Sequence, residues 1–221
     1  MSKIVAIGGG EMGRPKEGGG FYPIETTDID MEIVRLTNKR HPRLLFMPTA
    51  SYDSEDYYNV VKKHFLSLGC SAVDVLKLSK TVLSKRQLED LILSYDGIYV
   101  GGGNTLRLMT IWRKMGVDTI LSKAYERGIV LSGLSAGSIC WFSYGNSDSR
   151  RFTSGSDKLI KVSGLGFINA LHCPHYDVEH FRQQDLKRTM RSTPKVVAIA
   201  LDNCTAPVSY THLTLPTNRE V

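Results

Sequence analysis

The chain has 221 residues, of which 42% are hydrophobic and 23% charged, and its formal net charge is +6. This length suits one α/β domain with a substantial core, and the composition excludes a disordered chain. No apolar run approaches the ~18 residues of a membrane span and no signal-peptide pattern opens the chain, so we expect a cytoplasmic protein with no membrane partner. The basic residues do not alternate with aromatic ones as in single-strand binding, so we expect no nucleic-acid partner.

Short β-branched runs alternate along the chain with segments of helical periodicity. The predicted strands are residues 4–7, 44–47, 72–76, 97–100 and 129–131. The predicted helices lie near residues 28–34, 56–68, 87–93, 105–115 and 118–127. Strands that alternate with helices in this way form a parallel sheet with helices on both faces. Ligands bind such sheets beyond the carboxyl ends of the strands, and we expect the functional site there.

A G-x-S-x-G pentapeptide at residues 133–137 follows the last predicted strand. An apolar strand leads into it and a stretch able to form a helix, residues 138–142, leads out, which is the context of a nucleophile elbow. Such a turn strains the serine backbone and lifts its hydroxyl above the sheet, while small neighbours let strands approach closely. We therefore predict that Ser135 is a nucleophile and that the Ala136 amide helps to bind an oxyanion.

A serine nucleophile needs a general base, and the six histidines leave His172, His175 and His180 as candidates. His172 and His175 follow the apolar run 165–171, so a strand would bring them to the carboxyl edge of the sheet. His175 follows Pro174 and precedes a helix, and we favour it as the base. The segment lacks further ligands at zinc-like spacing, so we expect no metal ion and no cofactor.

Two glycine-rich turns follow other predicted strands. Residues 101–105, Gly-Gly-Gly-Asn-Thr, would let the backbone approach a substrate carbonyl and supply a second oxyanion donor. Residues 8–13 fit the dinucleotide pattern G-x-G-x-x-G, but that motif requires a helix to begin at once. Pro15 and the glycines at 18–20 prevent such a helix, so we do not expect a nucleotide site.

Together these segments resemble the peptidase E family, which comprises aspartyl dipeptidases and related cyanophycinases, from the first strand to about Ala206. The motifs that carry the resemblance are GGGNT at 101–105, GLSAGS at 133–138 and PHYD at 174–177. The resemblance implies one domain, residues 1–207, with an α/β three-layer sandwich, a mostly parallel sheet and the flavodoxin-like fold of class I glutamine amidotransferases. It also implies a serine-type peptidase that hydrolyses small peptides, with Asp-X dipeptides as its substrates.

The same resemblance implies the residues of the site. The family's nucleophile falls on Ser135 and its histidine on His175. The oxyanion amide of the glycine turn falls on Gly102 or Gly103, beside that of Ala136.

Other roles match less closely. Family members hold the substrate aspartate with an arginine downstream of the histidine, which here matches Arg182, and Asn104 is a second expected substrate-binding residue. We place the acidic member of the triad on Asp148, with Asp202 or Asn203 as alternatives. An asparagine would orient the imidazole as it does in papain-like enzymes.

The end of the chain departs from the family. Residues 208–221 read VSYTHLTLPTNREV, which matches a translated sequencing-adapter read and lacks the period-2 pattern of a core strand. We therefore expect a non-native tail at 208–221 that packs poorly, and a domain truncated at its C-terminal end.

Two other hypotheses stay open. A cyanophycinase-like hydrolase of an aspartate–arginine polymer, or an amidase, would keep the serine chemistry with another substrate. A catalytically silent amidotransferase-like binding domain would keep only the fold. The expected partner is a small peptide substrate, and the sequence is compatible with a homodimer.

Overall fold

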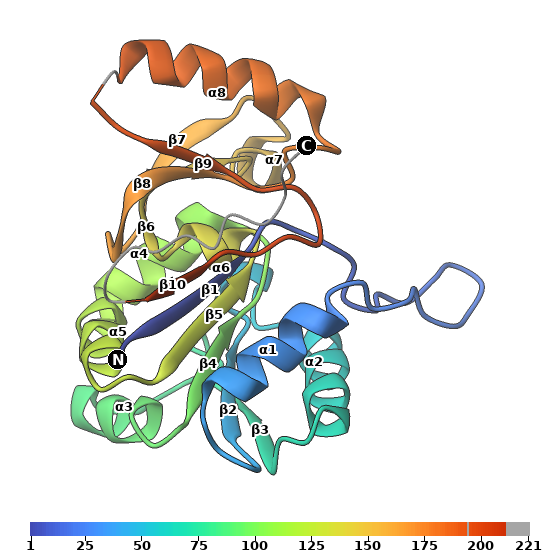
Figure 1. The fold of residues 1–221 in the computed structure, drawn as a ribbon, viewed down its shortest axis with the longest axis vertical. Helices are drawn as coiled ribbons and strands as arrows, with labels where there is room; N and C mark the ends of the chain where they lie inside the picture. The colour runs from blue at the N-terminus through green and yellow to red at the C-terminus, as the bar shows by residue number, and fades with distance from the viewer. Residues whose placement is uncertain (194, 211–221) are drawn as a thin grey trace.

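The structure is a computed structural model that describes residues 1–193 and 195–210. Its largest element is a six-stranded sheet (Figure 1). The strands are β1 (Lys3–Ile7), β2 (Arg43–Met47), β3 (Ala72–Val75), β4 (Gly97–Val100), β5 (Val130–Leu134) and β10 (Val208–Tyr210). They lie in the order β10-β1-β5-β4-β2-β3, and all but β10 run parallel. The five strands predicted from the sequence are therefore confirmed as one parallel sheet.

Alternate residues of each central strand enter two separate cores. In β1, Ile4 and Ala6 face one core, while Val5 and Ile7 face the other. Because side chains alternate along a strand, both faces of the sheet must be covered. Helices α3 (Lys85–Ile92), α4 (Thr105–Met115) and α5 (Val117–Glu126) complete the first core, and α1 (Thr27–Leu36) and α2 (Glu55–Ser67) the second. The result is the three-layer α/β arrangement expected from the sequence.

Local sequence sets where the helices begin and end. The Ser54 hydroxyl accepts a hydrogen bond from an N–H in the first turn of α2. Ser84 and Gln87 form a capping box at the start of α3. Gly116 ends α4 with φ 71°, a left-handed conformation that glycine adopts without strain.

A second sheet, which the sequence did not predict, lies beyond the serine turn (Figure 1). Helix α6 (Ala136–Ile139) ends after four residues, so the expected helix at 138–142 is wrong beyond its first turn. The chain then forms β6 (Phe142–Ser147), β7 (Ile160–Ser163), β8 (Ile168–Cys173) and β9 (Ala198–Ala200), in the order β7-β6-β8-β9. The short helix α7 (Arg151–Ser154) joins β6 to β7, and α8 (His180–Ser192) packs on β8 through Leu186.

The strand β10 closes one edge of the main sheet. It pairs antiparallel with β1, with Tyr210 opposite Lys3 and Val208 opposite Val5. Both Val208 and Tyr210 pack against the second core. The expectation that the chain packs poorly from residue 208 onward is therefore wrong for residues 208–210. The rest of the expected non-native tail, residues 211–221, lies outside the described residues.

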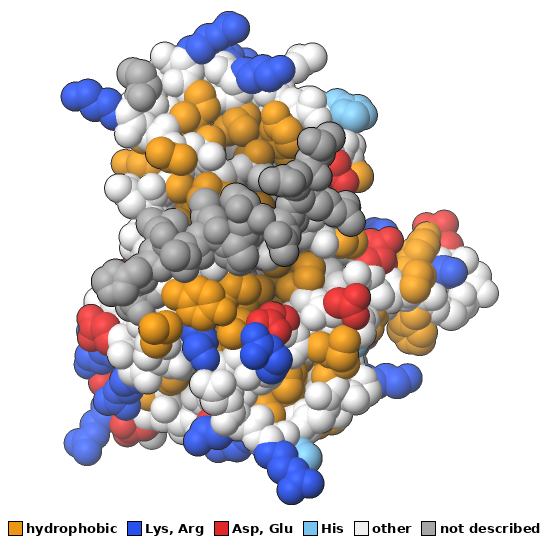
Figure 2. Space-filling model, in the orientation of Figure 1, with side chains coloured by type: hydrophobic (Ala, Val, Ile, Leu, Met, Phe, Trp, Pro, Cys, Tyr) orange, Lys and Arg blue, Asp and Glu red, His pale blue; other side chains and the backbone are white. Residues whose placement is uncertain are grey.

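The surface carries its basic residues at separate places. In Figure 2, Lys and Arg side chains lie at the end of the molecule that α8 covers and around the opposite end of the main sheet. None of the helices within residues 1–193 and 195–210 has the length and hydropathy of a membrane span.

We predict that β10 stabilises the domain. A chain that ends after Pro207 loses the pairing with β1 and the packing of Val208 and Tyr210, so its free energy of unfolding should fall by roughly 2 kcal/mol. The control is a chain that ends after Tyr210, which keeps the strand. Urea unfolding of both chains measures the difference, and equal stabilities would contradict a role for β10.

Candidate active site

Ser135 lies in the turn between β5 and α6 with φ 55° and ψ −109°, a strained conformation for a residue that has a side chain. Its two flanking glycines are needed for packing. A Cβ on Gly133 would lie 2.3 Å from the carbonyl oxygen of Gly137, and one on Gly137 would lie 2.1 Å from that of Val100. The pentapeptide therefore forms the sharp elbow that its spacing predicts.

The loop after β8 brings His175 to this serine. The Nε2 atom of His175 lies 2.8 Å from Ser135 Oγ, and its Nδ1 atom lies 2.7 Å from Asn203 Oδ1. An amide oxygen only accepts, so Nδ1 carries the ring proton and Nε2 is left to accept the serine proton. This is the tautomer that a general base requires.

Asn203, not Asp148, meets the histidine. Asp148 directly follows the C-terminal end of β6, and its carboxylate lies 3.7 Å from an Nη atom of Arg182. The expectation that Asp148 orients His175 does not fit this geometry, because β6 carries residue 148 toward α8. Asn203 was one of the alternatives left open by the sequence. Its own backbone N–H donates to Asp177 Oδ1 at 2.9 Å, so the aspartate of the PHYD motif holds the asparagine loop.

Three consecutive carbonyl groups at the end of β1 connect the loops that carry these residues. They accept hydrogen bonds from three backbone N–H groups: Ile7 from Ser135 at 3.0 Å, Gly8 from His175 at 3.1 Å and Gly9 from Cys204 at 2.9 Å. The backbone at the end of β1 thus sets the relative position of Ser135, His175 and the residue after Asn203.

Gly9 lies directly beside the hydrogen bond between His175 and Asn203. A Cβ on Gly9 would lie 2.1 Å from Asn203 Oδ1 and 2.3 Å from His175 Nδ1. Only glycine leaves room for that hydrogen bond. The sequence signal was present in the glycine-rich segment 8–13, but the dinucleotide motif was the wrong comparison for it.

The glycine turn after β4 lies beside the serine. A Cβ on Gly102 would lie 3.6 Å from Ser135 Cβ, and the Gly102 N–H donates to the Tyr57 hydroxyl at 3.4 Å. Gly103 has φ 131°, and a Cβ there would lie 2.5 Å from the Ala50 oxygen. Among the described residues, no acceptor binds the N–H groups of Gly103 and Ala136, so these could donate to an oxyanion. The Gly102 N–H could do so only by leaving the Tyr57 hydroxyl.

Neither of the two expected substrate-binding side chains reaches the cavity. Asn104 is 1% exposed, and its Oδ1 accepts the Arg107 N–H at 3.0 Å as the N-cap of α4. Arg182 is also 1% exposed and donates to Glu179 at 2.5 Å and to the Asn146 carbonyl at 2.9 Å. Both side chains are used inside the protein, which does not fit the roles expected for them.

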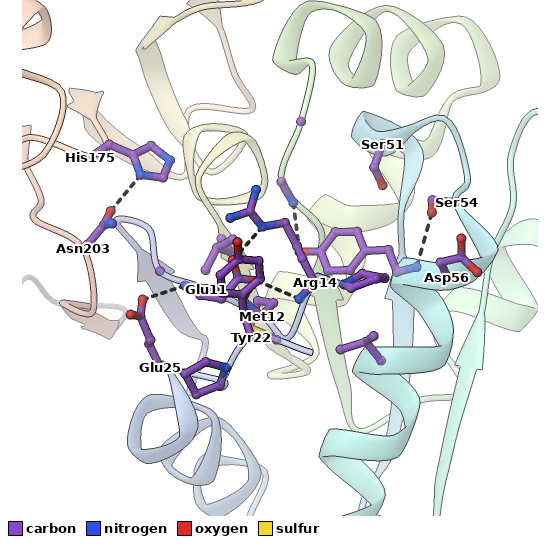
Figure 3. Close-up of a pocket in the computed structure, with 18 of the residues that line it drawn as sticks. Glu11, Met12, Arg14, Tyr22, Glu25, Ser51, Ser54, Asp56, His175 and Asn203 are labelled. Carbon is purple, nitrogen blue, oxygen red and sulfur yellow. Dashed lines mark hydrogen bonds and ion pairs between the residues drawn. The ribbon is translucent and has the colours of Figure 1, made fainter. Parts of the chain in front are cut away.

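A cavity of about 1210 Å³ is lined by Leu134, which precedes Ser135 in the chain, and by His175 and Asn203. In Figure 3, His175 and Asn203 lie on one side of it and Ser51, Ser54 and Asp56 on the other. Segment 10–25 forms a third wall between them. This wall was not predicted from the sequence, because segment 10–25 has no helix or strand whose pattern could be recognised.

A second serine–histidine pair lies away from the cavity. Ser138 Oγ is 2.8 Å from His172 Nε2, and the Nδ1 atom of His172 lies 3.0 Å from the Ile199 oxygen. Burial lowers the pKa of His172 to about 4, so the ring is neutral at neutral pH. His172 is fully enclosed, which distinguishes it from His175 as a base for a substrate reaction.

No three His, Cys, Asp or Glu side chains gather as metal ligands would within residues 1–193 and 195–210.

Comparisons with known proteins show the family to which this chain belongs. The family model described as "Peptidase family S51" matches residues 18–210. The chain is 37% identical over 183 residues to the uncharacterized peptidase YgaJ of Bacillus subtilis (strain 168), covering 83% of this chain and 72% of that protein. It is 28% identical over 144 residues to the uncharacterized peptidase PM1590 of Pasteurella multocida (strain Pm70), covering 63% and 67%.

Two solved structures have the same fold. One is a protein of Listeria monocytogenes EGD-e assigned to peptidase E, with a TM-score of 0.65, 20% identity and coverage of 95% of this chain and 94% of that one. The other is a peptidase from an acI-B1 Actinobacterium, with a TM-score of 0.68, 18% identity and coverage of 95% and 83%. These likenesses confirm the flavodoxin-like fold expected from the sequence.

We predict that His172 makes stability depend on pH. Its pKa is about 4 in the folded protein, against about 6.5 in an unfolded chain, so the unfolded state binds more protons between these values. The free energy of unfolding should therefore fall as pH drops through this window, by about 3 kcal/mol. Urea unfolding at several pH values measures how steeply the free energy of unfolding changes with pH, and His172→Gln should make this change less steep. A variant with the parental slope would contradict this role.

We also predict that Gly9→Ala slows peptide hydrolysis by about tenfold or more, because the added Cβ displaces the His175–Asn203 pair. The control is Gly19→Ala, in the same glycine-rich loop, where nothing lies within 4 Å of the added carbon. Alanine is strained at its φ of 103°, but this strain stays in an exposed turn. Steady-state rates at saturating substrate, on variants that circular dichroism shows to be folded, measure the effect. Equal rates for the two variants would exclude the positioning role of Gly9.

Proposed function

Because this chain belongs to peptidase family S51, it is a serine peptidase, and we propose that it hydrolyses small peptides through an acyl-enzyme on Ser135. We further propose Asp-X dipeptides as the substrate class. The observation that carries the mechanism is the chain of two short contacts, 2.8 Å from Ser135 Oγ to His175 Nε2 and 2.7 Å from His175 Nδ1 to Asn203 Oδ1.

In the proposed first step, Ser135 Oγ attacks the carbonyl carbon of the scissile bond and His175 Nε2 takes its proton. The strained elbow helps, because it holds the hydroxyl above the sheet and close to the imidazole before substrate binds. The tetrahedral oxyanion would accept hydrogen bonds from the amides of Ala136 and of Gly102 or Gly103. His175 then returns the proton to the leaving amine, and the C–N bond breaks.

In the second step, water attacks the acyl-enzyme with His175 again as the base, and the free acid leaves. Asn203 keeps the Nδ1 proton in place through both steps. An amide orients the imidazole but carries no charge, so it stabilises the protonated ring less than a carboxylate would. The proposal therefore assigns Asn203 to orientation of the ring.

The support for Asp-X dipeptides is the resemblance of the GGGNT, GLSAGS and PHYD motifs to the aspartyl dipeptidases. The cavity of about 1210 Å³ has room for a dipeptide. Arg182 no longer supports this substrate class, because its guanidinium is buried and already bonded.

One observation favours a second candidate substrate. Four carboxylates line the cavity, namely Glu11, Glu25, Asp56 and Glu179. Carboxylates bind the guanidinium of an arginine side chain well, so an aspartate–arginine polymer of the cyanophycin type is the alternative. Rates for Asp-Arg and Asp-Leu, compared with rates for the polymer, separate the two.

We predict that Ser135→Ala lowers kcat by on the order of 10³-fold or more and leaves the fold intact, because the two side chains differ little in volume. Hydrolysis of an Asp-X panel by both proteins measures the loss. Activity within a few-fold of the parent would rule out Ser135 as the nucleophile.

Two further variants test which residue orients the His175 ring. Asn203→Ala should lower kcat by about tenfold or more with little change in KM, because it frees the imidazole to turn. Asp148→Asn should leave kcat near the parental value, because Asp148 contacts Arg182 and not His175. The opposite ranking of the two variants would restore Asp148 as the triad member.

A further inference from the structure

Recognition of an aspartyl substrate needs a cationic group that faces the cavity, and one residue of the N-terminal segment fits that need. Among the described residues that line the cavity, Arg14 is the only lysine or arginine. The four carboxylates of the lining would repel a substrate carboxylate. A substrate carboxylate is therefore expected to bind next to the guanidinium of Arg14.

The contacts of Arg14 hold the guanidinium while leaving part of it free. Its Nε donates to Glu11 Oε2 at 2.6 Å, and its Cζ lies 5.2 Å from the centre of the Tyr22 ring. Among the described residues, none accepts a hydrogen bond from its Nη1 or Nη2. These two atoms form a planar edge that can bind a carboxylate through two parallel hydrogen bonds.

Glu11 fixes the orientation of this edge. Its Oε1 accepts the backbone N–H groups of Met12 at 2.9 Å and Arg14 at 2.8 Å, while its Oε2 binds the guanidinium. The Glu11 carboxylate thus ties the arginine to its own turn. In Figure 3, the Arg14 guanidinium points into the cavity between His175 and Ser51 in this view.

The same segment is held by contacts between its two ends and, just before its start, by one bond to the loop of Asn203. The Glu11 N–H donates to Glu25 Oε2 at 2.9 Å, and Met12 forms a β-bridge with Ile24. Just before it, the Gly9 oxygen accepts the Cys204 N–H, next to Asn203. The arginine therefore has a defined position relative to His175, although its side chain is 74% exposed.

We propose that Arg14 binds a carboxylate of the substrate and so determines specificity, in the place first expected for Arg182. This inference rests on the proposed peptidase function and adds the recognition residue to it. The carboxylate can be the side chain of an N-terminal aspartate or the C-terminal group of the peptide.

The test is the kcat/KM of Arg14→Ala for three substrates: Asp-Leu, Asn-Leu and Asp-Leu amide. We expect a loss of about tenfold or more for a substrate that keeps the recognised carboxylate and no change for one that lacks it. A loss of kcat/KM for Asp-Leu and Asp-Leu amide, but not for Asn-Leu, identifies the aspartate side chain as the group that Arg14 binds. A loss of kcat/KM for Asp-Leu and Asn-Leu, but not for Asp-Leu amide, identifies the C-terminal carboxylate as that group. Equal effects on all three substrates, or no effect, overturn the proposal.

The matched control is Arg35→Ala. Arg35 is 69% exposed and binds Glu32, three residues before it, through Nε at 2.6 Å and Nη2 at 2.5 Å. It is therefore a similar exposed ion pair, but it does not line the cavity. This variant should keep the parental kcat/KM for all three substrates. Arg14→Lys should recover only part of the Asp-Leu rate, because an ammonium lacks the planar edge.

Binding measurements separate this inference from the proposed function. In the Ser135→Ala background, the Kd of Asp-Leu, measured by calorimetry, should rise by about tenfold when Arg14→Ala is added. An unchanged Kd overturns the role of Arg14 whatever the outcome of the kinetics. If the parent enzyme hydrolyses none of the peptides, but the Kd still rises when Arg14→Ala is added to Ser135→Ala, the substrate proposal is refuted. The carboxylate-binding role of Arg14 then stands.

Discussion

The active site depends on the backbone at the end of β1. The carbonyl groups of three successive residues, 7–9, accept hydrogen bonds from the loops that carry Ser135, His175 and Asn203. These loops come from the end of β5, the end of β8 and the segment after β9, which lie far apart in the sequence. β1 and β5 are parallel neighbours and end at the same edge of the main sheet. The loops after β8 and β9 come from the second sheet, and their hydrogen bonds to Gly8 and Gly9 join that sheet to this edge.

This support explains two strained residues. Ser135 and His175 both have positive φ, at 55° and 53°, and neither is glycine. Such conformations persist only where the surroundings hold them, and here each residue donates its backbone N–H to the end of β1. The buried Ser138–His172 pair has a similar Oγ–Nε2 distance, but it lies away from the cavity. Its neutral histidine connects α6 to β9, through Ser138 and the Ile199 oxygen, and stacks on Phe142.

The sequence predicted the features that depend on local patterns. Five strands, the parallel sheet and the serine elbow follow from periodicity and from the spacing of glycines. The second sheet was missed because its strands are short and pair with partners far along the chain, β6 with β8 and β8 with β9. Arg182 and Asp148 were chosen by order along the chain, which does not reveal that they bind each other. Arg14 was missed because an irregular segment carries no signal of what it faces.

Ser135, activated by His175, is the proposed nucleophile. Peptide mapping by mass spectrometry after reaction of the protein with a fluorophosphonate, which reacts preferentially with activated serines, tests this role most directly. We expect a single adduct on Ser135 that disappears in His175→Ala. An adduct on Ser138 or on another serine, or labelling that is equally fast without His175, would contradict it.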